Sequence, residues 1–530
     1  MSAVFRNDAF LFLIIILVSF FASWYFGFIA INPIDNFTNY NSGYLVLEGK
    51  IPFRDYWVTT GPFLDFIQFF IFKISGVNWY GYIFHSALLN SLFCCLIFYT
   101  FRRLNLNKYL SLIYSLATGI TLYSQLGTPF VDHHSSIFGI TSLLLFILAI
   151  NKGNNLYWAL IPFFITIGFF SKQTPASYFA IIIFVYSLYF FFSRKDFQSF
   201  IVIFFSSISV LMLLSFLFLI LDIKFLDFYN QYIKFASSVG DARLSSDTFL
   251  KPFNFSRYFL KFKWLHLSYI PLIYVVFKSV SLDKAYLKSP DFISISLLIL
   301  SSYILIIHQL LTLNVKFIYF YIPILCGFCN IYLIKSSFPK KKVINQINIL
   351  VLIIACSYYF TNYILKQKFQ LFCNYEIKQE TVTQTDIIDN STSFNWISCL
   401  NNNPKKEVEN IKKILKFLNS EIDKDDNYVL ITDYQFLNSR LQNNNQVQIN
   451  KWYHPGVSYP LVNNIQFSYY KSFFFEKIKL NKIKFLIFVY PSHFRLENQL
   501  YYESMLENCD YKKLSQFDGL LVSLNIEKCY

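Results

Sequence analysis

Long apolar runs recur along this chain and restrict its fold more than any other feature. A helix needs about 20 mostly apolar residues to cross the hydrocarbon of a bilayer. Hydrophobic residues make up 55% of the 530 positions and charged residues only 15%, which is too few to cover a water-soluble surface. We therefore expect a polytopic α-helical membrane protein with about eleven transmembrane helices. The expected spans are 9–31, 81–101, 109–126, 135–151, 156–171, 175–193, 199–222, 264–280, 290–311, 317–334 and 344–364.

The basic residues predict the orientation of these helices. Lys and Arg collect in the cytoplasmic loops of membrane proteins, so the net charge of +15 does not by itself indicate a nucleic-acid partner, and no nucleic-acid-binding motif is present. With a cytoplasmic N-terminus, the short outer loops hold only Lys172 and Lys316, apart from the first outer loop. We expect a multi-pass protein of a bacterial inner membrane in this orientation. The basic residues of the predicted cytoplasmic side are Arg6, Arg102, Arg103, Lys108, Lys152, Arg194, Lys195, Lys278, Lys284, Lys288, Lys335, Lys340, Lys341 and Lys342.

The transmembrane domain is predicted to comprise residues 1–364, with long outer loops at 32–80 and 223–263. Within the first of these loops, Gly61–Ser75 is apolar, but it is short and contains charged and amide side chains. These properties favour an amphipathic helix that lies at the membrane interface. We therefore leave this segment out of the expected spans.

The remaining residues, 365–530, are far more polar and predict a separate extracytoplasmic domain. The spacing of apolar residues in 404–422 is typical of an amphipathic helix. The short runs 427–434, 483–490 and 519–526 are rich in residues that favour strands. Helices that alternate with buried strands indicate a small α/β domain.

Four of the nine cysteines fall in this C-terminal region. They are Cys373, Cys399, Cys509 and Cys529. An even number on an oxidising face permits two disulfides, and the sequence leaves three connectivities open. A zinc site is the weaker reading, because no C-x-x-C pair occurs there.

Two carboxylates follow predicted spans on the outer side. Asp35 lies where the chain leaves the bilayer, within reach of substrates held at the interface, although a single loop aspartate is most often only solvated. Asp132 lies in GTPFVDHHSSIFGI (127–140), a very short loop on the same predicted side. Ionisable residues at helix ends inside a bundle are costly and usually functional, but Asp132 or Ser135 could also simply cap the following helix.

His133 and His134 follow Asp132 directly, and the triplet contains residue types that bind metal ions. Three consecutive residues of one loop rarely all coordinate one ion, so we expect no metal site here. The sequence requires no cofactor and leaves open whether a divalent cation takes part. The two histidines are candidate substrate-binding residues.

Several basic residues on the outer side could bind a lipid-linked phosphate. Lys172 breaks the positive-inside pattern, and its alternative role is to extend its ammonium group to the interface. A guanidinium can hold phosphate oxygens in bidentate fashion, which makes arginines further candidates. We expect substrate contacts from Arg54 with its neighbour Asp55, and from Arg243 and Arg257.

Several short motifs together resemble a known group of enzymes. These are the carboxylate after the first span, GKIPFRDY (49–56), the TGP that precedes the predicted interfacial helix, the aspartate of a short later outer loop, and KQTP (172–175). The pattern, over roughly residues 1–200, is similar to GT-C-type polyprenyl-phosphate-sugar glycosyltransferases, which include protein O-mannosyltransferases and the lipid A aminoarabinose transferase. The relatives' PPL-type sequence at the end of the first loop is Gly61-Pro62-Phe63-Leu64 here.

This resemblance implies a reaction and a set of partners. A hexosyl or pentosyl group would move, with inversion, from a polyprenyl-phosphate donor to a lipid, glycan or protein acceptor at the bilayer. Asp35 would be the general base that takes the acceptor proton, and Asp132 would orient the acceptor or the sugar. Basic side chains would stabilise the departing lipid phosphate.

Two other functions stay open. A transporter or lipid flippase would place polar residues in broken helices near the midplane and often has repeated halves, whereas the polar clusters here lie at predicted helix ends. A non-catalytic envelope assembly protein would use the C-terminal domain as a binding module. The sequence does not identify the sugar or the acceptor.

Overall fold

The structure, a computed structural model, is organised as two compact units that are each assembled from separate stretches of the chain. The first unit comprises Met1–Gly27, Ser86–Ser215 and Ser246–Gln370, and the second comprises Phe28–His85, Phe216–Ser245 and Leu371–Tyr530. The residues described are 8–29, 31, 33–245, 256–312, 315–335, 341–365, 383–390, 392–396, 400, 403–423, 425–441, 445–490, 492, 494–517 and 519–529.

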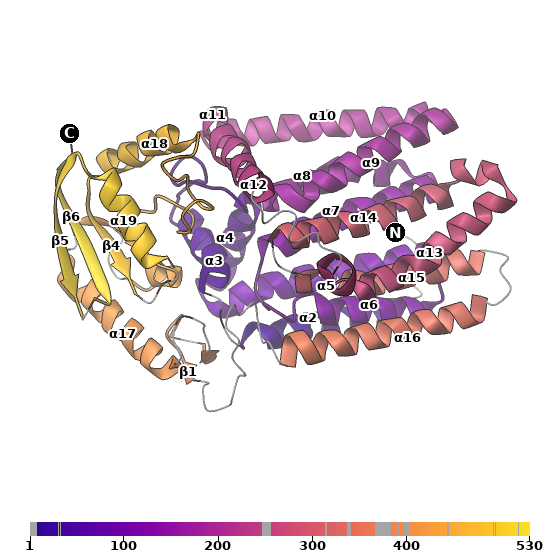
Figure 1. Cartoon of the computed structure of the whole chain (residues 1–530), viewed down its shortest axis with the longest axis horizontal. Helices are drawn as coiled ribbons and strands as arrows, with labels where there is room; N and C mark the ends of the chain where they lie inside the picture. The colour runs from indigo at the N-terminus through magenta and orange to yellow at the C-terminus, as the bar shows by residue number, and fades with distance from the viewer. Residues whose placement is uncertain are drawn as a thin grey trace. The chain divides into compact units, whose positions relative to one another are not determined.

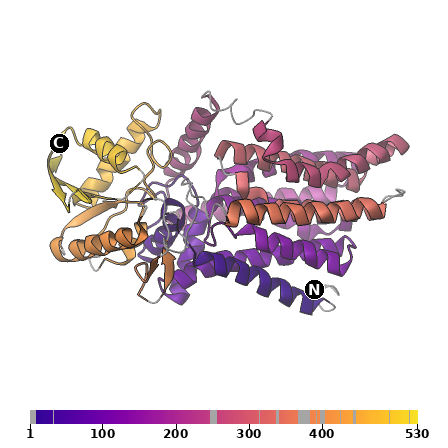
Figure 2. The ribbon, with the colours of Figure 1, turned by 60° about the horizontal axis from the view of Figure 1, so that its bottom comes forward.

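The first unit is a bundle with a helix at each predicted span (Figures 1 and 2). Within the described residues, eight helices are long and apolar enough to cross a membrane, while α6, α8 and α15 have 15, 17 and 15 residues. The polytopic membrane fold is confirmed. The helices are α2 (Ala9–Gly27), α5 (Trp79–Arg103), α6 (Lys108–Leu122), α7 (Val131–Lys152), α8 (Asn155–Ser171), α9 (Gln173–Arg194), α10 (Phe197–Ile220), α13 (Lys263–Leu282), α14 (Pro290–Thr312), α15 (Tyr321–Lys335) and α16 (Lys341–Tyr359), with the short segments η2 (Ser256–Leu260), η3 (Lys284–Lys288), η4 (Val315–Ile318) and η5 (Phe360–Leu365).

Helices α7 and α10 differ most in their surroundings. The most apolar part of α7 is 94% buried, and it packs against α8, α9 and α14. The corresponding part of α10 has no buried residue, although it is apolar all round. An apolar helix that is largely exposed, with only one side partly covered, is stable only in an apolar solvent, so α10 is a lipid-facing helix and α7 is the centre of the bundle.

The second unit joins the predicted first outer loop to the C-terminal domain, which we define as residues 371–530. Its sheet has the order β3-β4-β6-β5, in which β3 and β4 are parallel and the other two pairs are antiparallel. Figure 1 shows α18 and α19 beside this sheet. The elements are α3 (Pro33–Leu47), α4 (Pro62–Ser75), α11 (Phe225–Phe228), η1 (Tyr229–Phe235), α12 (Ala236–Ser245), β1 (Thr383–Thr385), β2 (Phe394–Trp396), α17 (Pro404–Glu421), β3 (Asn427–Ile431), η7 (Gln435–Ser439), α18 (Phe467–Leu480), β4 (Ile483–Val489), α19 (Arg495–Met505), β5 (Cys509–Gln516) and β6 (Leu521–Cys529).

The predicted α/β character of the C-terminal domain is confirmed. Helix α17 and strands β3, β4 and β6 lie where the apolar patterns indicated them. Strand β5 was not predicted, because its sequence CDYKKLSQ is polar. It pairs only with β6, at the edge of the sheet, and most of its residues are exposed, so no apolar alternation marks it.

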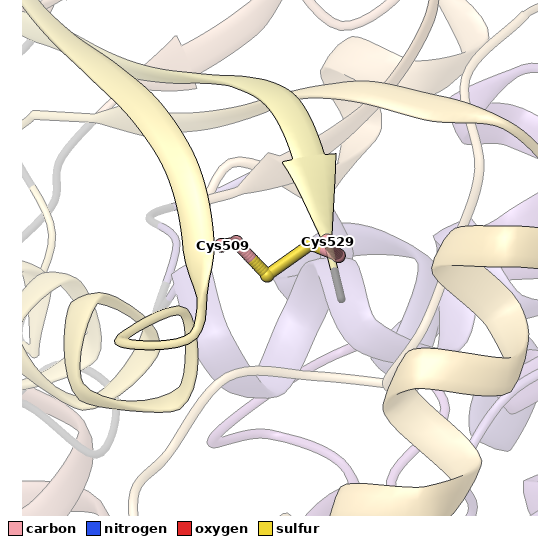
Figure 3. The surroundings of a disulfide bond; sticks show 2 residues. All are labelled: Cys509 and Cys529. Carbon is pink, nitrogen blue, oxygen red and sulfur yellow. A yellow bond between two sulfur atoms is a disulfide. The ribbon is translucent and has the colours of Figure 1, made fainter.

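One disulfide links the two strands at this edge. Cys509 and Cys529 are register partners of β5 and β6, and their sulfur atoms are bonded (Figure 3). The other two cysteines of the domain, Cys373 and Cys399, lie outside the described residues. The bond closes a loop with a sequence separation of 20 residues.

Replacing Cys529 by Ser is expected to destabilise the C-terminal domain. Opening a loop of this length costs about 2–4 kcal/mol in the chain-entropy description of disulfides. Limited proteolysis of the wild-type and Cys529→Ser proteins would measure the effect as a faster loss of this domain. Equal proteolysis rates would contradict the prediction, and Cys356→Ser, which removes a free cysteine of the bundle, is the matched control.

Candidate active site

A buried group of charged side chains lies at one end of the helix bundle. Asp132, in the first turn of α7, accepts hydrogen bonds from Nζ of Lys172 at 2.8 Å on both carboxylate oxygens. Nε2 of His308, from α14, lies 2.7 Å from Oδ1 of Asp132. The Asp132 side chain is 3% exposed, whereas that of Lys172 is 18% exposed. Three separate parts of the chain thus supply one ion-paired cluster.

The position of Lys172 follows from a break between two helices. It lies between α8 and α9 with extended backbone angles (φ −165°, ψ 141°). Thr174, which precedes Pro175, is also extended, because a proline disfavours helical geometry in the residue before it. Oγ of Ser135 donates to the carbonyl of Lys172 at 2.9 Å and accepts the N–H of Ala176 at 3.2 Å. The break therefore directs the lysine back onto the start of α7.

The three residues of the DHH triplet make different contacts. The ring of His133 stacks on Tyr123, with centroids 5.1 Å apart, and packs against Phe317. Nδ1 of His134 lies 2.9 Å from the carbonyl of Phe130. Among the described residues, no group of three or more His, Cys, Asp or Glu side chains is arranged to hold a metal ion. The histidines are buried neighbours of the Asp132 cluster.

Sequence reasoning missed His308. It lies in the apolar sequence of α14, and the signal that could have found it is the general rule that an ionisable residue inside a span marks a functional site or a buried partner. Its hydrogen bond to a carboxylate, which can only accept, requires a proton on Nε2. The ring donates from Nε2 to a carboxylate that already holds an ammonium group, so a neutral or a protonated imidazole satisfies this contact.

Asp35 lies in the second unit, in the first turn of α3. It is half-buried, at the helix end where a negative charge is stabilising. This segment was predicted to be part of a loop, but it forms helix α3, which is polar in sequence and yet mostly buried. The carbonyl of Asn36 accepts a hydrogen bond from Tyr82 at 2.6 Å, so the chain next to Asp35 is held in place.

The arginine candidates have different surroundings. Arg54 is paired with Asp55 at 2.8 Å and donates to the carbonyl of Leu221 at 3.2 Å. The hydrogen bond to Asp55 raises the pKa of Arg54 above its usual value. Arg243 is exposed on α12, and the side chain of Arg257 lies outside the described residues. Arg54 and Asp55 thus form an ion pair within the first loop, and Arg54 also links this loop to Leu221.

The segment predicted to form an interfacial helix is helical as α4, in which Asp65 and Gln68 point inward while Lys73 is exposed. Asp65 and Gln68 are fully buried, and Oε1 of Gln68 lies 3.0 Å from Nδ1 of His85. The large apolar residues Phe70 and Ile74 are exposed instead. An apolar outer face suits contact with lipid, whereas the polar face serves the interior of the second unit.

Comparison with known proteins finds a similarity over part of the chain. The sequence model of one family, described as dolichyl-phosphate-mannose-protein mannosyltransferase, matches residues 59–219. This is a GT-C type family, and the match supports a membrane glycosyltransferase in general. The matched range contains Asp132 and Lys172 and begins after Asp35. No curated protein matches the chain.

Proposed function

We propose that this chain, a membrane glycosyltransferase of the GT-C type, transfers a sugar from a polyprenyl-phosphate-linked donor to a hydroxyl group of a lipid, glycan or protein. The observation that carries the proposal is the Asp132–Lys172–His308 cluster at helix ends, of which Asp132 and Lys172 lie within the matched segment. Buried charges at such positions are costly and are usually retained for function. The proposed site faces the extracytoplasmic side, as the distribution of Lys and Arg predicts.

The proposed reaction exchanges one bond at the anomeric carbon for another. The bond between this carbon and the phosphate oxygen breaks, and polyprenyl phosphate leaves with the bonding electrons. The acceptor oxygen forms the new bond from the opposite face, which inverts the anomeric configuration. Asp35 takes the proton of the acceptor hydroxyl as the bond forms. The transition state is oxocarbenium-like, so positive charge develops on the sugar ring.

Lys172 has the chemistry to assist the departure of the phosphate. An ammonium group carries three N–H donors, and among the described residues the contacts of Nζ are to the two oxygens of Asp132. The third donor can therefore serve a phosphate oxygen without loss of the pair. Asp132 fixes the direction of the lysine side chain, and His308 holds Asp132 from the other side. Asp132 and His308 thus hold the ammonium group of Lys172 in one position.

The donor class is tested with purified protein in liposomes. Polyprenyl-phosphate-linked sugars and the matching nucleotide sugars are supplied in turn with a mixture of acceptors, and release of polyprenyl phosphate is measured. We expect release only with the lipid-linked donors. Release of a nucleotide from the nucleotide sugars would contradict the proposal. Movement of intact donor across the bilayer without release would favour the flippase alternative.

Replacing Lys172 by Ala is expected to weaken use of the donor more than use of the acceptor. The phosphate loses an ionic hydrogen bond, and such bonds contribute about 1.5–3 kcal/mol, or roughly ten- to a hundredfold in kcat/KM for the donor. Steady-state kinetics on folded protein, with each substrate varied in turn, measures both values. Equal losses for the two substrates would argue against a phosphate contact.

A further inference from the structure

A fully buried ion pair in the second unit has no part in the reaction described above. Asp65, in α4, and Lys451, in the C-terminal domain, have side chains that are both 0% exposed, and Nζ lies 2.6 Å from Oδ1. Burial raises the pKa of the Asp65 carboxyl and lowers the pKa of the Lys451 amine, because each charge is removed from water. Isolated buried charges of this kind are strongly unfavourable unless they are paired and hydrogen-bonded.

Both members of this pair are held by further hydrogen bonds. Nζ of Lys451 also donates to the carbonyls of Thr60 at 3.0 Å and Gly61 at 3.1 Å, which uses all three of its donors. The carboxylate of Asp65 accepts the hydroxyl of Tyr56 at 3.1 Å on its second oxygen. The network therefore connects the C-terminal domain to the chain that leads into α4.

The backbone continues this connection. The N–H of Trp57 donates to the carbonyl of Ile449 at 2.7 Å, and the N–H of Lys451 donates to the carbonyl of Trp57 at 2.9 Å. These two bonds are a short stretch of strand pairing between the first loop and the C-terminal domain. The pairing sets Trp57 opposite Asn450, and the side chain of the next residue, Lys451, reaches the carbonyls just before α4.

The same carboxylate also holds the helix that carries Asp35. Oγ of Ser42, in α3, donates to Oδ1 of Asp65 at 2.6 Å. Asp35 and Ser42 are separated by about two helical turns, so they lie on the same side of α3. A bond that fixes the rotation of α3 at Ser42 therefore fixes the direction of Asp35. A second contact, from Nδ2 of Asn438 to Oδ1 of Asn41 at 2.8 Å, ties α3 directly to the C-terminal domain.

We infer that the Asp65–Lys451 pair is a positioning device for Asp35, and that the C-terminal domain is thereby a structural part of the active site instead of a separate binding module. The inference rests on the proposed function, because it takes Asp35 to be the base. A buried ion pair contributes little net stability compared with apolar residues of similar volume. Instead, the hydrogen bonds of such a pair fix the orientation of the side chains and backbone groups that are bonded to it.

The test begins with Lys451→Met, which removes the ammonium group and leaves the carboxylate of Asp65 unpaired. We expect kcat per folded molecule to fall by about a hundredfold, because a shift of a catalytic group by about 1 Å has an effect of this size. The donor KM is expected to change little, since Lys172 belongs to the other unit. The matched control is Lys484→Met, which breaks an exposed ion pair with Asp426 in the same domain and is expected to leave kcat unchanged.

Two further variants keep the inference falsifiable if Lys451→Met folds poorly. Asp65→Asn combined with Lys451→Met leaves no unpaired charge, so it is expected to recover most of the folded protein, while kcat stays low because the pair is absent. Ser42→Ala removes the bond to α3 without exposing a charge, and is expected to lower kcat with little change in thermal stability. A wild-type kcat in Ser42→Ala, or a folded Lys451→Met protein with wild-type kcat, would overturn the inference.

A readout without sugar transfer separates this inference from the proposed function. Asp35→Cys places a thiol at the position of the expected base, and its rate of reaction with a membrane-impermeant maleimide reports how that position is presented. The parent protein supplies the background from native cysteines. We expect Lys451→Met and Ser42→Ala to change this rate severalfold, and Lys484→Met to leave it unchanged. Unchanged rates would refute the positioning role, whether or not the wild-type protein transfers sugar.

Discussion

Asp35→Asn is expected to abolish sugar transfer while the protein still folds and inserts into the membrane. The amide has the shape of the carboxylate but cannot accept the acceptor proton. General base catalysis contributes about 10²–10⁴-fold to rates, so we expect kcat to fall by at least that factor. The measurement is release of polyprenyl phosphate from the lipid-linked donor, normalised to folded protein.

The control for this variant is Asp241→Asn. Asp241 is an exposed aspartate of α12 in the same unit, and the same loss of charge there is expected to leave transfer unchanged. Asp35 also lies at a helix N-terminus, where a carboxylate contributes about 0.3–1 kcal/mol to helix stability. That small contribution predicts a near-normal unfolding transition. Full activity in Asp35→Asn would remove Asp35 from the mechanism and leave Asp132 as the carboxylate to test next.

Lys172→Ala is expected to destabilise the helix bundle strongly. The substitution leaves the buried carboxylate of Asp132 with His308 alone, and breaking a buried ion pair by removing one partner costs about 3–5 kcal/mol. Adding Asp132→Asn removes the unpaired charge, so the double variant is expected to recover most of this loss. The free energy of unfolding in a detergent titration measures the three variants against wild type.

An exposed ion pair of the same unit provides the comparison. Lys335 pairs with Asp291 at 2.6 Å, and their side chains are 36% and 28% exposed. Exposed pairs contribute about 0–1 kcal/mol, so Lys335→Ala is expected to change stability far less than Lys172→Ala. Similar losses at the two lysines, or a double variant as unstable as Lys172→Ala, would mean that the Asp132 carboxylate is not the source of the effect.

The helices of the bundle could be predicted because their sequences carry the signal locally. Each span must satisfy its own backbone hydrogen bonds in lipid, and this requires a continuous apolar helix. The segment 225–245 was expected to be a loop and is helical instead. Its structure depends on contacts with the first loop, where the amide of Gln231 accepts the N–H of Val58 and donates to the carbonyl of Phe53. The pattern of apolar residues within 225–245 gives no information about such a long-range contact.

Two members of the Asp132 cluster were singled out from the sequence, but His308 and the pairings within the cluster were not. Asp132 and Lys172 were singled out as residues that are costly to place near a membrane, and this reasoning needs only their position relative to a span. It assigned Lys172 to a phosphate and did not foresee its pairing with Asp132. Asp65 was taken for a polar position of an interfacial helix. Its burial could not be predicted from the sequence, because it depends on Lys451, a distant residue that pairs with it.

The sequence by itself determined the membrane class, the helices and the α/β character of the C-terminal domain, because apolar periodicity is a property of neighbouring residues. Only the tertiary structure decided which charges meet. Lys172 and Asp132 are 40 residues apart, His308 and Asp132 are 176 apart, and Lys451 and Asp65 are 386 apart. A charged side chain is buried only where another part of the chain compensates its loss of hydration. That compensation depends on the folded arrangement, which no stretch of sequence contains.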